Sequence, residues 1–323
     1  MPQSISVWNC IVFFTFAFWL QYITQRPNLI PEFPTAMAAP VEYLKVTKVT
    51  PGYWRATFNN PPTNLWGPET SLAVWKLLDD LEKDDSVRVV VFDSAAPNFF
   101  VMHLDVTQGI ETMVPPGRRW ANLVQRLSQS PVVSLAAIRG RARGLGSEFA
   151  LACDMRFASK EKGIIGQPEV GAGLIPGGGG PEWLPRIVGR SRALEIIIGS
   201  DDFDASTAEL YGYINRAIPD AEFEEWVDKF ARRIGAFPKY AVASMKATVN
   251  VRSGLPTGSE FEQSWSTFID VCQQDETKKR MGKLMEWGIQ QDSQCERELG
   301  KFIGMLDTHP DWKPEKKTPH EDL

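Results

Sequence analysis

Residues 131–182 constrain the fold of this chain more than any other stretch, because glycine-rich turns interrupt apolar segments there in a fixed order. The apolar run Pro131 to Ile138 predicts a buried strand, the glycines of 140–146 predict a turn, and the residues from Ser147 to Cys153 predict a helix. This order aims unpaired backbone N–H groups at whatever lies above the helix N-terminus, where the helix dipole also favours negative charge. The sequence therefore predicts an oxyanion site built from backbone groups.

Two glutamates belong to this stretch. Glu148 falls in the first turn of the predicted helix, and Glu169 falls in the glycine-rich loop 166–180. Apolar neighbours of Glu169 should desolvate its carboxyl, which raises the pKa and suits the group to donate as well as accept a proton. From the residues alone two interpretations stay open. The carboxyls form a proton-transfer pair, or Glu148 is an ordinary first-turn glutamate and Glu169 accepts backbone N–H bonds.

The motif Arg139–Glu148 and the motif Gly166–Glu169 resemble the signatures of the crotonase (enoyl-CoA hydratase/isomerase) superfamily. The resemblance extends more weakly from about Val41 to about Phe302. It implies an α/β crotonase-type fold of repeated ββα units, with a C-terminal helical oligomerisation region from about residue 191. It also implies a homotrimer or homohexamer, and an enzyme in which both glutamates are catalytic.

The segment Phe100–Asp105 matches the family's loop after its third core strand. By this resemblance the backbone N–H groups of Leu104 and Leu145 form the oxyanion hole, although His103 and Leu145 stand where the family usually has glycine. His103 either acts as an acid or base beside the thioester or fixes the loop through backbone bonds. Asp105 either orients the site or caps a helix that begins near Val106. Substrate contacts are expected by resemblance at Met102, Gly144, Arg143 and Lys279.

The reaction that the resemblance implies is syn addition of water across a 2-enoyl-CoA thioester, a step of the kind found in fatty acid metabolism. Glu148 and Glu169 would activate water, and Glu169 would protonate the α-carbon. Double-bond isomerisation and acyl-CoA hydrolysis are alternatives, because a fold does not decide among these chemistries. A non-catalytic homologue that binds acyl thioesters or serves in assembly is the alternative from another class. Coenzyme A enters with the substrate, and no permanently bound cofactor is expected.

The charge and the cysteine content of the chain limit which classes of ligand it is expected to bind. The 323 residues contain 35 Lys and Arg against 40 Asp and Glu, so the net charge of −5 argues against nucleic acid as a ligand. The arginines at 139, 141 and 143 suit the phosphates of coenzyme A better, with solvated or inter-subunit arginines as the alternative. The four cysteines lack metal-site spacing, which predicts reduced intracellular thiols and no metal.

The N-terminus carries an uncharged apolar run at residues 5–23, close to the ~20 residues that span a bilayer. Either it anchors the protein to a membrane, or the working protein begins at Met37 and the run is a spurious extension.

The expected organisation is an N-terminal segment and linker (1–40), a catalytic domain (41–302) and a polar, disordered tail (303–323). Localisation is expected to be intracellular, either soluble or membrane-anchored. Further predicted elements are strands at 43–49, 53–58 and 87–93 and helices at 71–82, 205–213, 220–237 and 260–274.

Overall fold

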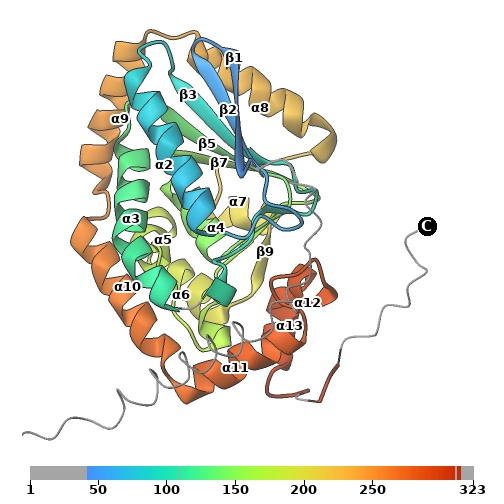
Figure 1. Cartoon of the computed structure of the whole chain (residues 1–323). Coiled ribbons are helices and arrows are strands. Elements are labelled where there is room, and N and C mark those ends of the chain that lie inside the picture. Colours follow the sequence, from blue (N-terminus) through green and yellow to red (C-terminus); the bar gives the residue numbers. More distant parts are fainter. Residues whose placement is uncertain (1–41, 109, 310, 314–323) are drawn as a thin grey trace, which may run out of the picture. The chain divides into compact units, whose positions relative to one another are not determined.

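The computed structural model describes residues 42–108, 110–309 and 311–313 (Figure 1). The apolar run 5–23 and the candidate start at Met37 lie outside these residues. Within the described part of the chain, no helix combines the length and the apolar character that crossing a bilayer requires.

A six-stranded sheet forms the main layer, in the order β1-β2-β3-β5-β7-β10. Strands β1 and β2 are antiparallel, and the remaining neighbours are parallel. The strands are β1 (Leu44–Thr50), β2 (Tyr53–Phe58), β3 (Val89–Ser94), β5 (Val133–Ile138), β7 (Met155–Ser159) and β10 (Arg216–Ile218). The predicted hairpin and the predicted strands at 87–93 and 131–138 are thereby confirmed, within one or two residues at most ends.

Both faces of this sheet are covered by helices, which explains why its parallel strands are almost continuously apolar. Successive side chains of a strand point to opposite faces. On β3, Val89 and Val91 pack with α8 (Asp220–Gly235), whereas Val90 and Phe92 pack with the helices of the other face. Those helices are α2 (Pro68–Lys83), α3 (Ile110–Gln129) and α4 (Leu145–Ala152).

A second, smaller sheet has the order β4-β6-β8-β9. Strands β4, β6 and β8 are parallel to one another, and each follows a strand of the main sheet along the chain. Their carboxyl ends therefore meet at one edge, and the segments that follow them carry Leu104, Leu145 and Glu169. The strands are β4 (Phe99–Val101), β6 (Arg141–Arg143), β8 (Ile164–Gly166) and β9 (Asp202–Asp204).

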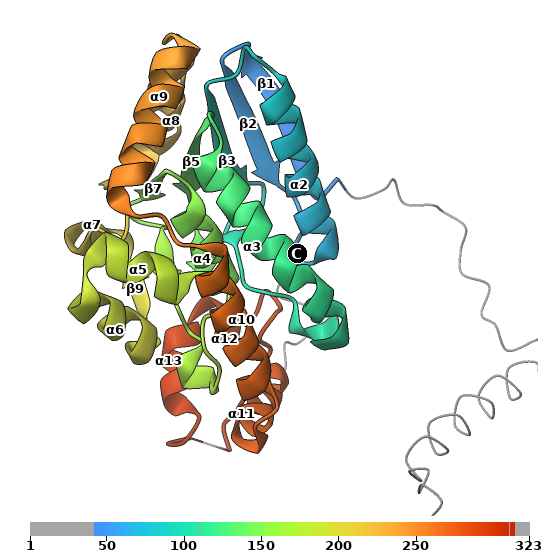
Figure 2. The ribbon, with the colours of Figure 1, turned by 90° about the vertical axis from the view of Figure 1, so that its left-hand side faces the viewer.

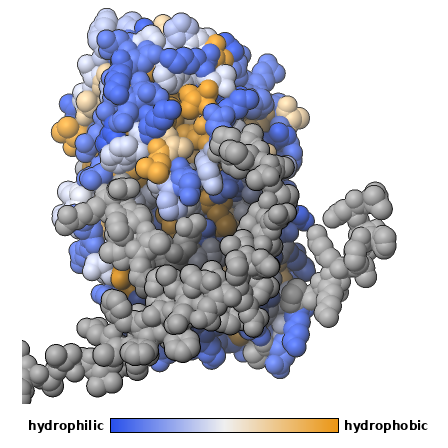
Figure 3. All heavy atoms as spheres, in the orientation of Figure 1, coloured by the Kyte–Doolittle hydropathy of each residue, from blue (hydrophilic) through white to orange (hydrophobic). Residues whose placement is uncertain are grey.

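The C-terminal half is mostly helical, as predicted, and α10 packs alongside α3 (Figure 2). Its helices are α5 (Gly180–Val188), α6 (Arg190–Gly199), α7 (Ala205–Tyr211), α9 (Lys239–Ser253), α10 (Gly258–Cys272), α11 (Asp275–Glu286), α12 (Gln294–Arg297) and α13 (Leu299–Met305). Two 3-10 turns, η2 (Val106–Gln108) and η3 (Val170–Ala172), lie next to the loops named above. The expected α/β fold with a C-terminal helical region is confirmed. Figure 3 shows a mostly hydrophilic face with scattered apolar side chains.

The helices α11 to α13 build a small core of their own, which includes Leu284, Trp287 and Phe302. This core continues past residue 302, where the polar tail was expected to begin. Helix α13 runs to Met305, and the Trp312 ring lies 4.7 Å from the Phe302 ring.

Candidate active site

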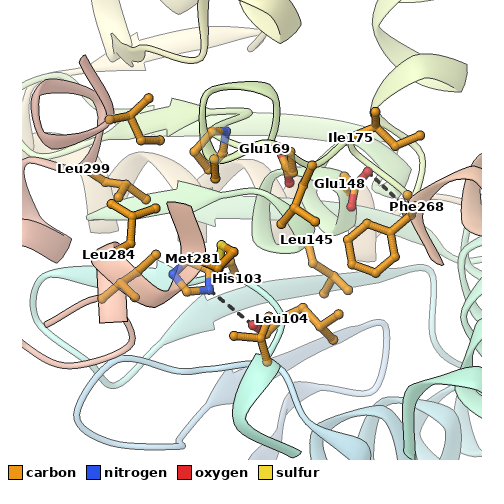
Figure 4. A pocket seen from close by; sticks show the side chains of 18 of the residues that line it. His103, Leu104, Leu145, Glu148, Glu169, Ile175, Phe268, Met281, Leu284 and Leu299 are labelled. Atoms are coloured by element: carbon orange, nitrogen blue, oxygen red, sulfur yellow. Dashed lines mark hydrogen bonds between the residues drawn. The ribbon is translucent and has the colours of Figure 1, made fainter. Parts of the chain in front are cut away.

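A narrow cavity of about 70 Å³ lies at the edge where β4, β6 and β8 end (Figure 4). Among the described residues that line it, the side chains with titratable groups are His103, Glu148 and Glu169. The opposite walls are apolar and come from α10, α11 and α13 of the same chain. The cavity thus combines a few polar groups with a hydrocarbon surface, which is the usual character of a ligand site. Its apolar walls include Phe268, Met281, Leu284, Leu299 and Ile303.

Glu148 is held in one orientation by the glycine run of the second motif. Its Oε1 atom accepts hydrogen bonds from the N–H groups of Gly178 at 2.8 Å and of Gly180 at 2.9 Å. A side chain at 178 has no room, because an added Cβ would lie 2.4 Å from Glu148 Oε2. Burial raises the pKa of Glu148 to about 7, although the N–H groups of Gly180 and Gly178 oppose that rise.

Glu169 lies at the start of η3, and its carboxyl reaches the N-terminus of α4. A Cβ added at Gly144, the residue before α4, would lie 2.7 Å from Glu169 Oε1. Glu169 Oε2 is buried and has no hydrogen-bond partner among the described residues. Burial and then the charge of Glu148 raise the pKa of Glu169 well above its usual range, the direction expected from its apolar neighbours.

The two carboxyls therefore belong to one coupled system. When one carboxyl is ionised, its negative charge raises the free energy of ionising the other carboxyl. The pair therefore favours a state in which one of the two keeps its proton. Glu148 receives two N–H bonds, which stabilise its ionised form, whereas Glu169 Oε2 has no such donor. The arrangement suits a pair in which Glu148 is the base and Glu169 holds the proton.

The N–H groups of Leu104 and Leu145 are placed by the loop after β4 and by the first turn of α4. Leu145 is the first residue of the helix, where backbone N–H groups have no intrahelical acceptor. A hydrogen bond of 3.2 Å from Gly146 N–H to Met102 O joins the helix start to the loop. Leu104 pairs with Trp66 in a parallel bridge, through His103 O and Asp105 N–H, so its own N–H points away from Trp66. Within the described residues, neither Leu N–H donates a backbone hydrogen bond.

His103 lines the cavity, but both of its ring nitrogens contact other groups of the protein. Nε2 lies 3.1 Å from Glu296 Oε2, and Nδ1 lies 3.2 Å from Leu104 O. Burial lowers the pKa of His103, and the Glu296 carboxylate outweighs this effect, so the net pKa is raised. Of the two roles expected for His103, loop fixation fits these contacts. Asp105 accepts hydrogen bonds from the N–H and hydroxyl of Thr107, at the start of η2.

Of the four residues expected to contact the substrate, three lie inside the protein and one lies on its surface. Met102 is buried beneath the loop, and Gly144 is the residue before α4, with a φ of 50°. Arg143 is also buried, and its guanidinium donates to Asp202 and to backbone carbonyls, so its hydrogen-bonding groups are already used inside the protein. Lys279 lies on the exposed surface of α11, 3.7 Å from Glu276.

The sequence analysis did not identify several contributors to the site. The glycines at 178 and 180 belong to the glycine-rich loop, and their N–H groups bind Glu148. Gln290 and Glu296, which contact the loop of His103, come from the C-terminal segment and match no motif. Among the described residues, no group of three or more His, Cys, Asp or Glu side chains is arranged to hold a metal ion.

The chain is similar to known proteins in sequence and in fold. Residues 52–290 match the sequence profile of the Enoyl-CoA hydratase/isomerase family. The short-chain-enoyl-CoA hydratase of Clostridium acetobutylicum is 28% identical over 239 residues, which cover 71% of this chain and 90% of that protein. The crotonyl-CoA hydratase of Syntrophomonas wolfei is 30% identical over 193 residues, covering 58% and 73%.

A solved structure is similar over more of the chain. The crystal structure of a candidate enoyl-CoA hydratase from Streptomyces avermitilis superposes with a TM-score of 0.78 and 42% identity, covering 83% of this chain and 99% of that one. The profile match includes both glycine motifs and both glutamates. This chain therefore belongs to the enoyl-CoA hydratase/isomerase (crotonase) superfamily.

Proposed function

We propose that this protein hydrates 2-enoyl-CoA thioesters, adding water across the double bond through an enolate. The observation that carries the proposal is the pair of buried carboxyls, Glu148 and Glu169, on one cavity beside the N–H groups of Leu104 and Leu145. A hydration needs a base for water, an acid for carbon and donors for the oxygen that becomes negative. The cavity contains a candidate for each of these roles.

The first step forms the enolate. Glu148 accepts a proton from water, the oxygen of that water bonds to the β-carbon, and the electrons of the double bond move onto the thioester oxygen. The N–H groups of Leu104 and Leu145 would stabilise that oxygen, and removal of such a donor typically costs roughly 3 to 4 kcal/mol of transition-state stabilisation. The bonds from Gly178 and Gly180 keep Glu148 oriented toward the water.

The second step protonates the α-carbon. Glu169 donates the proton that its raised pKa retains, the thioester carbonyl re-forms, and a 3-hydroxyacyl-CoA results. Glu169 Oε2 is suited to this role because no donor in the described residues holds it elsewhere. Transfer of the proton from Glu148 to Glu169 then restores the starting state.

The acyl chain would occupy the apolar part of the cavity. Its walls are side chains of α10, α11 and α13, which favour hydrocarbon over polar acyl groups. Coenzyme A leaves as part of the 3-hydroxyacyl-CoA product, so it is not a resident cofactor. Lys279 is our candidate for a contact with its phosphates, because its ammonium is exposed at the protein surface.

The test is turnover of crotonyl-CoA and of longer and branched 2-enoyl-CoAs by the full chain. Loss of the conjugated thioester absorbance with the gain of one water in the product mass is the expected result. Glu148→Gln and Glu169→Gln should each lower the rate by at least about 10²-fold, the usual contribution of a general acid or base. Glu209→Gln, an exposed glutamate on α7, is the matched control and should not change the rate.

Other products would identify the alternatives. A moved double bond without added water would favour the isomerase, and release of free coenzyme A would favour the hydrolase. Binding of acyl-CoA without turnover of any substrate would favour a non-catalytic binding protein. Wild-type rates in both glutamate variants would contradict the mechanism.

A further inference from the structure

A buried charge cluster lies behind the oxyanion loop, and the mechanism above does not use it. It consists of His103, Arg143, Asp202 and Glu296. The side chains of Arg143 and Glu296 are 1% and 0% exposed. Arg143 bonds Asp202 through two nitrogens, each at 2.6 Å, and its Nη1 lies 3.6 Å from Glu296 Oε1. Asp202 is 24% exposed, but Glu296 is not exposed, and its buried negative charge is costly unless a second cation balances it.

The contacts of His103 indicate that its ring supplies this cation. Glu296 Oε2 lies 3.1 Å from Nε2 and Leu104 O lies 3.2 Å from Nδ1, and both oxygens are acceptors. The amide nitrogen of Gln290, a donor, lies farther from Nδ1, at 3.4 Å, and donates instead to Leu104 O at 2.8 Å. An imidazole that donates from both nitrogens carries a proton on each and is positively charged. With His103 protonated, the cluster holds two cations and two carboxylates.

Gln290 makes a second connection between the C-terminal segment and the loop. Its backbone N–H donates to Glu296 Oε2 at 2.8 Å, and its side-chain Nε2 donates to Leu104 O at 2.8 Å. Gln290 has a φ of 69°, a left-handed conformation that is uncommon for a residue other than glycine. Such conformations persist where surrounding contacts enforce them. Glu296 therefore binds both residues whose side chains contact Leu104 O, which are His103 and Gln290.

These contacts determine the orientation of the two peptide units around Leu104. His103 O accepts from Trp66 N–H, and Asp105 N–H donates to Trp66 O, each at 3.0 Å. Leu104 O accepts from Gln290 on the other side. Among the described residues, the Leu104 N–H is the polar group of these two peptides that has no partner. Neither peptide can rotate without breaking one of these bonds.

We propose that His103 and Gln290, both held by Glu296, are positioning residues that hold the Leu104 carbonyl, while Trp66 holds the preceding peptide, so that the Leu104 N–H faces the thioester oxygen. The segment Gln290–Glu296 would thus belong to the active site although it touches no reacting atom. The expected effect of these residues on the hydration rate rests on the proposed function. The protonated state of His103 and the polarity of the oxyanion site can be measured without turnover.

The first measurement uses the full chain and compares Glu296→Gln with Glu298→Gln. Glu296→Gln keeps the shape and one acceptor but removes the charge, whereas Glu298 is an exposed carboxylate two residues away that pairs with Lys301. We expect Glu296→Gln to lower kcat about tenfold or more with KM changed less than about threefold, because the donor acts mainly on the transition state. Glu298→Gln should match the wild type. Gln290→Met, which removes the bond to Leu104 O while keeping the side-chain length, should lower kcat in the same way.

The second measurement observes the imidazole directly. The chain has three histidines, so ¹⁵N-histidine NMR gives few signals, and His103→Asn assigns the one of interest. The charged groups that face His103 are Glu296 from α12 and Arg143 from β6. We expect both ring nitrogens to be protonated at neutral pH in the wild type. The ring should lose its proton at lower pH in Glu296→Gln, because the carboxylate that raises its pKa is gone.

The third measurement tests the oxyanion site without hydration. Acetoacetyl-CoA ionises to an enolate that absorbs ultraviolet light, and an intact oxyanion site favours that form. At fixed pH the enolate absorbance of the bound ligand should fall about threefold in Glu296→Gln and in Gln290→Met, and remain in Glu298→Gln.

Three results would overturn the proposal: a neutral His103 ring at neutral pH, an unchanged kcat in folded Glu296→Gln and Gln290→Met, or an undiminished enolate signal in both. If the wild type hydrates no enoyl-CoA, the proposed function fails, and the NMR and enolate measurements still decide the positioning role. Circular dichroism of each variant identifies loss of folding.

Discussion

The carboxyls of Glu148 and Glu169 differ in what holds them, and this difference supports the roles that we propose for them. Glu148 accepts two backbone N–H bonds, whereas Glu169 Oε2 has no hydrogen-bond donor among the described residues. Both lose solvation in the same cavity, which raises both pKa values. Such a pair keeps one proton at neutral pH, but the other carboxyl is then ionised in an apolar cavity, which destabilises the folded state. Buried carboxyls of this kind should therefore reduce the stability of the fold.

Replacement of Glu148 by glutamine tests this cost. Burial raises the pKa of Glu148 from its ordinary value of 4.5 to about 7, so the folded state binds the proton more tightly than the unfolded state. Stability from this group is present below the unfolded value and is lost as pH rises toward about 7. Glu148→Gln does not ionise, and its Oε1 can still accept both N–H bonds. At about pH 8 its free energy of unfolding in urea should exceed that of the wild type by about 1 to 3 kcal/mol.

The difference should shrink at about pH 5, where the wild-type carboxyl is protonated in the folded state. Glu209→Gln should behave like the wild type at both pH values. A glutamine variant that is less stable than the wild type at about pH 8 would contradict a raised pKa for Glu148.

The sequence revealed these two glutamates because each sits in a local glycine motif with a recognisable spacing. It did not reveal Glu296, which contacts His103 across 193 positions of the chain. Nothing in the residues around Gln290 or Glu296 distinguishes them from an ordinary polar surface segment. Their role depends on tertiary packing, which brings α12 against the loop. Local patterns thus predict groups that a tight turn presents, but not the distant side chains that support it.

At the level of elements, periodicity predicted the long helices and the buried strands. The strand at 53–58 has the bounds that its pattern predicted, and α8 ends two residues before its predicted end. The strands of the smaller sheet were missed because β4, β6, β8 and β9 have three residues each, too few to show an alternation. These short strands nevertheless bring together the segments that carry Leu104, Leu145 and Glu169. Sequence patterns therefore predicted the layers more completely than the edge that carries the site.

Helix α11 should influence which acyl chains fit. Met281 and Met285, one turn apart, both pack against the core of α11 to α13, but of the two Met281 lines the cavity. Met281→Ala should enlarge the cavity and raise kcat/KM for longer 2-enoyl-CoAs relative to crotonyl-CoA by about tenfold, since a methylene in an apolar pocket is worth about 1 to 3 kcal/mol. Met285→Ala should leave that ratio unchanged. Equal ratios in the wild type and Met281→Ala would exclude α11 from the acyl site.

At the scale of the whole molecule, α9 leaves apolar side chains uncovered. Met245 and Val249, one turn apart, are 62% and 53% exposed, and Val251 is 84% exposed. A cavity of about 670 Å³ lies between α9 and the body of the domain, and Met245 and Val249 line it. Apolar side chains appear in Figure 3 at the edge where Figure 1 draws α9. Exposed apolar surface of this kind is typical of a contact with another protein.

We expect this surface to contact further copies of the chain, in the homotrimer or homohexamer that the family resemblance implied. The mass in solution, measured by light scattering after size-exclusion chromatography, should then be three or six times the 36.2 kDa of one chain. The double substitution Met245→Glu and Val249→Glu should lower that mass, because it would bury charges without partners at the contact. Leu72→Glu, at a 58% exposed position on α2, is the control and should preserve the mass of the wild type. A wild-type monomer, or a double variant with the wild-type mass, would show that α9 is not the assembly surface. Retained enoyl-CoA turnover by a dissociated variant would further show that one chain supplies a complete site, as expected from walls built by its own α10, α11 and α13.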